Sequence, residues 1–123
     1  MAKSRLQTEQ KILKAVETLL LEQGYPAVGV NAIARQAGCD KVLIYRYFGG
    51  YDGLLLSFAE ATQLWWEVDQ VMSETAEQLA RQPLHQYLQT LLKRHASCLQ
   101  AMPVTLEIMA WEMSEQNNLT IAL

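Results

Sequence analysis

Apolar residues recur at helical spacing along most of this chain. Between Leu6 and Gln23 they fall three or four positions apart, with charged side chains on the other faces, as in an amphipathic helix. Gly24 and Pro26 end this segment, because glycine commonly closes helices and proline cannot continue one. No alternating run rich in valine or threonine indicates a β-strand. The pattern therefore predicts an all-α fold.

Two short helices are predicted next, over residues 30–37 and 41–48, each closed by glycine. Asp40 precedes the second, where its carboxylate is suited to accept a hydrogen bond from an amide two or three residues on. Two short helices around a tight glycine turn make a helix-turn-helix candidate. In that motif the second helix enters the major groove of DNA and the first crosses the phosphate backbone. A three-helix corner without a ligand shows the same spacing, so this pattern alone leaves both interpretations open.

The second half of the chain predicts longer helices. An apolar seam from Leu54 to Met72 favours one continuous helix that starts near Asp52. Residues 73–82 are polar and alanine-bearing, which fits either a frayed helix end or a loop.

Prolines divide the remainder. Pro83 suits the first turn of a helix that reaches Met102, and Pro103 forces a break after it. A last helix is predicted over residues 104–115, and Asn117 with its asparagine neighbour ends it before another segment begins.

Composition is compatible with this picture. The chain has 123 residues, of which 50% are hydrophobic and 19% charged, which suits one soluble globular unit or two small helical subdomains. No stretch reaches the roughly 18 apolar residues that a membrane helix needs, and no apolar segment of signal-peptide type follows the basic N-terminus. We therefore expect a cytoplasmic protein without a membrane partner.

Catalytic and metal chemistry find little support. Cys39 and Cys98 are far apart, and no cysteine–histidine spacing indicates a metal. No nucleophile with a nearby base and no glycine-rich phosphate loop is present. Glu112 and Glu115 lie three residues apart, as expected for a solvated helix face. We expect neither an enzyme nor a cofactor.

Charge is distributed unevenly along the chain. Its net value is −3, but residues 1–50 hold seven basic against four acidic side chains, and residues 51–123 hold three against nine. A basic front half can meet a polyanion that an acidic rear half repels. A chance fluctuation of a few charges is the alternative.

The run GYPAVGVNAIARQAGCDKVLIYRYFGGYDGLL carries a more specific pattern. It resembles the N-terminal DNA-binding domain of TetR-family transcriptional regulators, over about residues 8–58. The pairs that carry the resemblance are Gly24-Tyr25, Ile33-Ala34, Ala37-Gly38, Ile44-Tyr45, Tyr47-Phe48 and Leu54-Leu55.

This resemblance implies a fold and a function. Residues 1–50 are expected to form a three-helix helix-turn-helix domain, and residues 51–123 a helical domain for effector binding and dimerisation. Such regulators are typically repressors that bind a palindromic operator as homodimers and leave it when a small molecule binds. Family members are usually much longer, and this chain ends at Leu123, so we expect the second domain to be incomplete.

The resemblance places the DNA contacts on and beside the second short helix. Tyr45 and Tyr47 are expected at the DNA surface, where a phenol can donate to a phosphate. Lys41 can reach a base or a phosphate, and Leu43 can touch a thymine methyl group. The amide at Gly29, at a helix start, can hold a phosphate without a side chain. The expected DNA contacts are Gly29, Asn31, Lys41, Leu43, Tyr45, Arg46, Tyr47 and Tyr51.

Other residues near this helix have different expected roles. Ile44 and Phe48, four residues apart, are expected in the core. Lys3 and Arg5 are expected either as an arm in the minor groove or as an ordinary disordered basic terminus.

The sequence departs from the family pattern inside the recognition helix. Val42 and Leu43 stand where glycine and a small hydroxyl residue are frequent, and Tyr51 takes the place of the usual lysine. The alternative hypothesis is therefore a small-molecule-binding helical domain with weak or lost DNA binding.

Effector residues are expected in the second half. Methionine suits adaptable pockets, although ordinary core is the competing interpretation, and a core position is also favoured for His95 on its apolar helix face. The expected effector contacts are Trp65, Met72, His95, Met102 and Met109.

Overall fold

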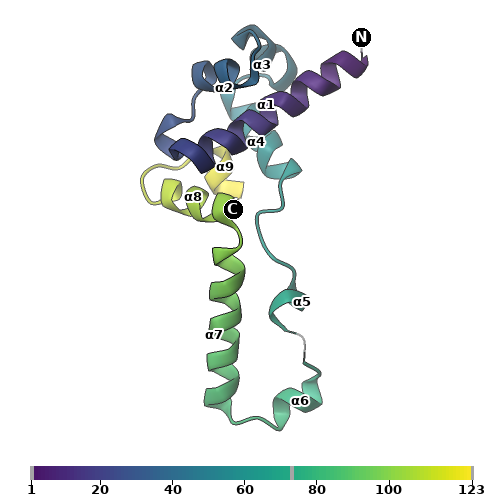
Figure 1. Ribbon diagram of the computed structural model, residues 1–123, viewed down its shortest axis with the longest axis vertical. Helices are drawn as coiled ribbons and strands as arrows, with labels where there is room; N and C mark the ends of the chain where they lie inside the picture. Colours follow the sequence, from purple (N-terminus) through teal and green to yellow (C-terminus); the bar gives the residue numbers. More distant parts are fainter. Residues whose placement is uncertain (1, 73, 123) are drawn as a thin grey trace.

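The computed structural model describes residues 2–72 and 74–122, and every regular element within these ranges is a helix (Figure 1). The all-α prediction is confirmed. The elements are α1 (Ala2–Gln23), the 3₁₀ helix η1 (Tyr25–Ala27), α2 (Val30–Ala37), α3 (Lys41–Phe48), α4 (Tyr51–Ala61), α5 (Val68–Val71), α6 (Ala76–Ala80), α7 (Leu84–Gln100), α8 (Pro103–Glu112) and α9 (Asn118–Ala122).

The two short helices α2 and α3 have the predicted bounds because local signals fix both ends. Gly38 follows α2 in the left-handed conformation with φ 72°, which favours glycine, and its amide donates back to the carbonyls of the last turn. Before α3, a carboxylate oxygen of Asp40 accepts a hydrogen bond of 3.0 Å from the amide of Val42. The predicted N-cap is therefore confirmed.

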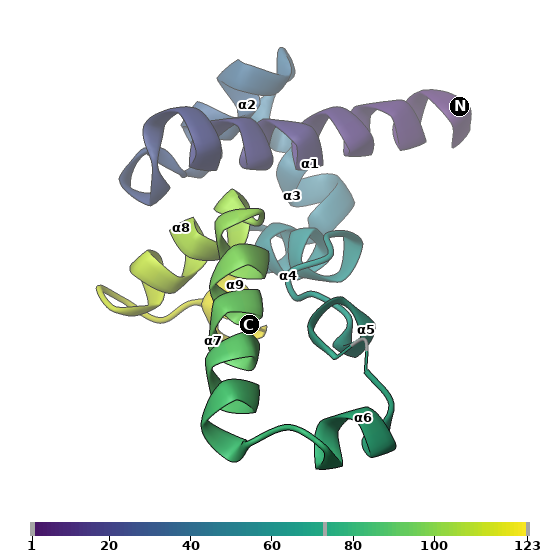
Figure 2. The same cartoon turned by 60° about the horizontal axis from the view of Figure 1, so that its bottom comes forward.

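One hydrophobic core holds the front helices together with the last two. It takes five side chains from α1 and three from α4, and α8 and α9 supply Ile108, Trp111 and Leu119. Figure 2 shows α8 and α9 beside α1 and α4, in agreement with their contacts. We call this body the head: α1 to α4 with α8 and α9.

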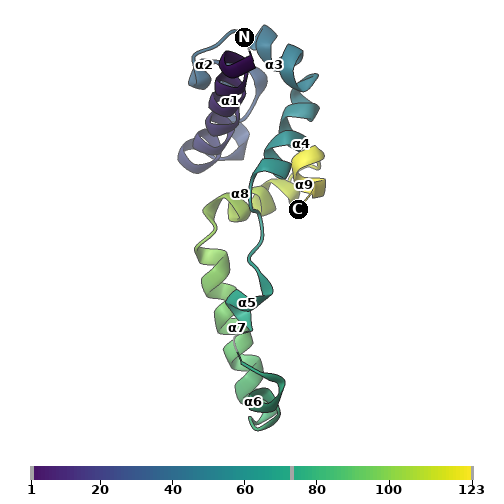
Figure 3. The same cartoon turned by 90° about the vertical axis from the view of Figure 1, so that its right-hand side faces the viewer.

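Residues 65–72 and 74–102 form an arm that projects from the head (Figures 1 and 3). Within it α5 packs against α7, and the chain turns back at α6. None of the described side chains of α7 is buried. The predicted apolar face of this helix is thus uncovered in part, since Leu84, Leu88 and Leu92 are 70%, 47% and 70% exposed.

The prediction of one continuous helix from Asp52 to Met72 is wrong. Helix α4 ends at Ala61, and Thr62 is extended with φ −116° and ψ 134°. Two residues later Leu64 is buried in the head core, and its carbonyl accepts a hydrogen bond from the Thr105 hydroxyl of α8. Because this anchor lies across the fold, the apolar periodicity of the segment does not reveal it.

An ion pair attaches the segment after α5 to α7. The Arg94 guanidinium makes two hydrogen bonds to the Glu74 carboxylate and donates a third, of 2.9 Å, to the Val71 carbonyl. The hydrogen bonds to Glu74 raise the pKa of Arg94 further above its ordinary value. The arm is therefore closed by side-chain contacts from α7 to the chain around α5.

The last part of the chain follows its predicted breaks. Pro103 opens α8 in its first turn, and the helix ends at Glu112, three residues before the predicted end. The side chain of Asn117 accepts hydrogen bonds of 2.9 and 3.0 Å from the amides of Leu119 and Thr120. Asn117 thus starts α9, which is the predicted further segment.

Candidate nucleic-acid interface

Helices α2 and α3 form a corner at the end of the molecule opposite to α6 (Figures 1 and 3). The two helices contact each other, and α2 also packs along α1. Ile33 and Ala34 of α2 and Ile44 of α3 are buried in the head core. The inner face of the corner is thus packed against the core, and its outer face is exposed.

The outer face of α3 is a mixture of cationic, aromatic and apolar groups. Lys41 and Arg46 are exposed, Tyr45 is 54% exposed and Val42 is 50% exposed. Leu43 is half-buried, so only part of its side chain reaches the surface. Helical phase separates these groups from Ile44, which is completely buried. The prediction that Ile44 belongs to the core is confirmed, and Phe48 packs half-buried against the same core.

The side chain of Tyr47, on α3, contacts α1. Its ring packs against the head core, and the guanidinium carbon of Arg5 lies 4.9 Å from the ring centroid, a cation–π contact. Arg5 also donates a hydrogen bond of 3.0 Å to Glu9. Since α1 begins at Ala2, Arg5 lies on a helix, so the disordered-terminus alternative is wrong for this residue, and a minor-groove contact stays a prediction.

The start of α2 offers main-chain donors. Gly29 is its N-cap in an extended conformation, φ −173° and ψ 164°, and no side chain caps the helix there. The first amides of a helix lack intrahelical partners and attract anions. Asn31 is exposed in the same first turn. Gly29 and Asn31 thus lie at the exposed start of α2, and a phosphate contact there stays a prediction.

Tyr51 lies mostly inside this corner. Its ring packs against the core, and its hydroxyl donates a hydrogen bond of 3.4 Å to the Val28 carbonyl, just before α2. Burial, followed by the negative charges of Glu115 and Asp52, raises its pKa to about 12. A DNA contact by Tyr51 stays a prediction, and the geometry favours a bracing role between α4 and α2.

Alkaline unfolding tests this bracing role. The raised pKa stabilises the fold below the ordinary phenol pKa of 10.0, and the contribution is lost as pH rises toward about 12. We expect Tyr51→Phe, which has no proton to lose, to show a smaller fall in the free energy of unfolding across this interval. Urea titrations at each pH measure it. Tyr45→Phe, at an exposed site on α3, is the control, and an equal fall in wild type and Tyr51→Phe would contradict the assignment.

The turn between α2 and α3 holds a cysteine. Cys39 is half-buried and packs against the core. Burial, with a smaller effect of the neighbouring Asp40 carboxylate, raises the pKa of its thiol. The thiol is therefore kept protonated at neutral pH and acts as a small apolar group.

The five expected effector residues are divided among three hollows. Met72 and His95 line one of about 230 Å³, Met102 lines another of about 500 Å³, and Trp65 with Met109 lines a third of about 400 Å³. The structure therefore does not gather them into one pocket. The core interpretation of His95 is wrong, since this side chain is exposed.

Trp66 was not among the expected effector residues, yet it lines both the 230 Å³ and the 500 Å³ hollow. Its ring meets the His95 ring edge-on, with centroids 5.6 Å apart. Its sequence position beside Trp65 gives no sign of this placement, because it depends on the break after α4.

Other kinds of site are not indicated by the described residues. Among residues 2–72 and 74–122, no group of three or more metal-ligating side chains is close enough to hold an ion. In the same ranges no helix has the length and apolar character needed to cross a bilayer.

Comparison with known proteins shows what part of the head resembles. Residues 12–58 match the family model described as bacterial regulatory proteins, tetR family. This segment, which is less than half of the chain, is similar to the N-terminal domain of TetR-family regulators. It covers the second half of α1, then η1, α2 and α3, and α4 up to Phe58.

Two curated relatives of the TetR-type segment come from Mycobacterium tuberculosis, one from strain CDC 1551 / Oshkosh and one from strain ATCC 25618 / H37Rv. Both are named as uncharacterized HTH-type transcriptional regulators, and each is 35% identical over 48 residues, which is 39% of this chain. The match spans only 24% of each relative's length. No solved structure gives a significant match.

Proposed function

We propose that this protein is a cytoplasmic, DNA-binding transcriptional repressor. In this proposal it binds a palindromic operator as a homodimer and leaves it when a small-molecule effector binds. The observation that carries the proposal is α3, whose exposed Lys41, Tyr45 and Arg46 surround the buried anchor Ile44 inside the TetR-type segment. A helix held in this way can enter the major groove without losing its packing.

The outward residues divide by chemistry. Lys41 stands in the first turn of α3, the part of a recognition helix that approaches base edges. Arg46 and the phenol of Tyr45 are suited to phosphate oxygens, which position the helix and carry no sequence information. Leu43, half-buried, can reach a thymine methyl group with the exposed part of its side chain.

Contacts between η1 and α8 support the proposed effector response. The Tyr25 amide donates a hydrogen bond of 2.7 Å to Glu107, and its hydroxyl lies 2.7 Å from the Ser114 hydroxyl. Its ring stacks on Trp111 with centroids 6.0 Å apart. In this proposal, these contacts carry a shift of α8 to the chain just before α2, where the DNA face begins.

The exposed leucines of α7 support the proposed homodimer. Leu84, Leu88 and Leu92 follow one another at steps of four and share one face of the helix. An apolar helix face of this kind is a frequent interface element.

A single substitution tests the DNA-binding proposal. Tyr45→Ala removes the exposed phenol and leaves the buried face of α3 intact, so we expect unchanged folding and an affinity for promoter DNA about tenfold lower. Fluorescence anisotropy with a labelled fragment of the promoter next to the protein's own gene measures it. Ile121→Ala, at a 69% exposed position on α9 away from the α2–α3 corner, is the control and should bind as wild type. Equal affinity of Tyr45→Ala and wild type would remove Tyr45 from the interface.

One observation favours the alternative function. Val42 is half exposed on the outer face of α3, where it offers neither charge nor hydrogen bond to DNA. The alternative is a small-molecule-binding helical protein whose DNA binding is weak or lost. Weak binding that does not distinguish the promoter from unrelated DNA would support it.

A further inference from the structure

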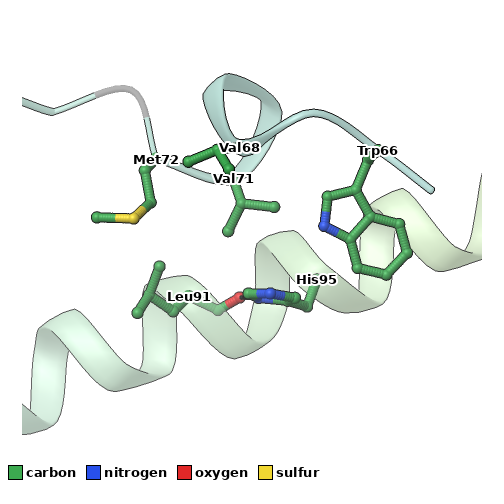
Figure 4. A pocket seen from close by; sticks show the side chains of 6 residues that line it. All are labelled: Trp66, Val68, Val71, Met72, Leu91 and His95. Atoms are coloured by element: carbon green, nitrogen blue, oxygen red, sulfur yellow. Dashed lines mark hydrogen bonds between the residues drawn. The ribbon is translucent and has the colours of Figure 1, made fainter.

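The smallest of these three hollows lies in the arm and has the chemistry of a ligand site. It lies between the chain around α5 and one side of α7, as Figure 4 shows, and has a volume of about 230 Å³. Pockets for drug-sized ligands span roughly 300–1,000 Å³, so this hollow suits a smaller molecule. Its walls are Trp66, Val68, Val71, Met72, Leu91 and His95.

The lining favours a neutral occupant. It contains no carboxylate, lysine or arginine side chain. The nearest cation in sequence, Arg94, is already bound to Glu74 and to the Val71 carbonyl. Burying an unpaired charge costs several kcal/mol or more, and a charged ligand finds no counter-ion on these walls.

Two polar groups remain for a ligand. His95 Nδ1 lies 2.8 Å from the Leu91 carbonyl, and because a carbonyl only accepts, Nδ1 carries the proton. Nε2 of the neutral ring is then an acceptor without a partner among the described residues. The indole nitrogen of Trp66, a donor, is turned toward the hollow in Figure 4. The two rings meet edge-on, with centroids 5.6 Å apart, so both polar groups belong to neighbouring walls of the same hollow.

A hydroxyl group satisfies this pair, since it donates to one partner and accepts from the other. The apolar and aromatic walls, including the Met72 thioether, suit a flat hydrocarbon body. We propose that the hollow between α5 and α7 binds a small neutral aromatic alcohol of the phenol class. The identification of this molecule as the effector rests on the proposed function.

Isothermal titration calorimetry with two probes tests the chemical class. The probe 1-naphthol has the proposed hydroxyl, and 1-methoxynaphthalene has the same rings but no donor. We expect wild type to bind 1-naphthol about five- to tenfold more tightly. His95→Phe, which keeps an aromatic ring but removes the acceptor, should lower the affinity for 1-naphthol by a similar factor and leave 1-methoxynaphthalene unaffected. His85→Phe, exposed in the first turn of α7, is the matched control and should bind both probes as wild type.

The outcomes separate this inference from the proposed function. Equal affinity of wild type for the two probes, equal binding of 1-naphthol by wild type and His95→Phe, or no binding of either probe would overturn the inference. Promoter binding by the same preparation, measured without any probe, decides separately on the proposed function. If 1-naphthol binds as expected but leaves promoter binding unchanged, the ligand class stands and the effector role of this hollow is contradicted.

Discussion

Gly53→Ala is expected to lower the free energy of unfolding by about 3 kcal/mol, the upper end for overpacked sites. Gly53 lies in the first turn of α4, directly after the recognition helix. A β-carbon at this position would overlap the carbonyl oxygen of Phe48, a main-chain atom that cannot rotate away. In an ordinary helix the same change stabilises by about 1 kcal/mol, so the expected sign is reversed here.

The reason for this sensitivity is the close turn between α3 and α4. The two helices are separated only by Gly49 and Gly50, so the start of α4 lies against the end of α3. Moving α4 to accept a methyl group also moves Leu54 and Leu55, which are completely buried. The orientation of the recognition helix depends on this packing, and DNA binding should fall together with stability.

Urea unfolding followed by circular dichroism measures the effect of Gly53→Ala. Gly29→Ala is the control, because a β-carbon at Gly29 meets no atom within 4 Å and its φ of −173° suits any residue. We expect Gly29→Ala to lower the free energy of unfolding by at most about 1 kcal/mol, because alanine is less favourable than glycine at an N-cap. Similar losses in the two variants would contradict the close approach of Gly53 to Phe48.

Ile44→Ala is also expected to have a large effect and to lower the free energy of unfolding by about 2–5 kcal/mol. Ile44 is completely buried, and α3 has no other fully buried side chain among its described residues. Removing it leaves a cavity behind the recognition helix and weakens its attachment to α1, α2 and α4. Since the free energy of unfolding of a small domain is only about 5–15 kcal/mol, this loss is a large share of it.

Val42→Ala separates core from surface on the same helix. Val42 lies two residues earlier and is half exposed, so we expect a change within about 0.5 kcal/mol. The same urea titration measures both variants. A loss in Ile44→Ala no larger than in Val42→Ala would contradict the placement of Ile44 in the core.

The helix-turn-helix could be predicted closely because short-range signals set its limits. Asp40 accepts from the amide two residues on, and Gly38 and Gly49 adopt the left-handed conformation directly after their helices. Each signal acts within a few residues and is therefore visible in the sequence. The core position of Ile44 also followed from helical phase alone.

The arm could not be predicted in the same way. The break after Ala61 depends on burial of Leu64 and on its hydrogen bond from Thr105, which is 41 residues away. Once α4 ends there, residues up to Met72 no longer follow the phase of one helix, so Trp65 and Met72 line different hollows and Trp66 faces His95. Tyr51 shows the same limit, since its partner Val28 lies 23 residues away, between η1 and α2.

We expect the α2–α3 corner to bind DNA at a specific site. Fluorescence anisotropy of wild type on its own promoter fragment and on a shuffled fragment, at a series of salt concentrations, measures this specificity. We expect the affinity for the promoter to exceed that for the shuffled fragment by at least about a thousandfold and to fall steeply as salt rises. Equal, weak binding to both fragments would contradict the claim.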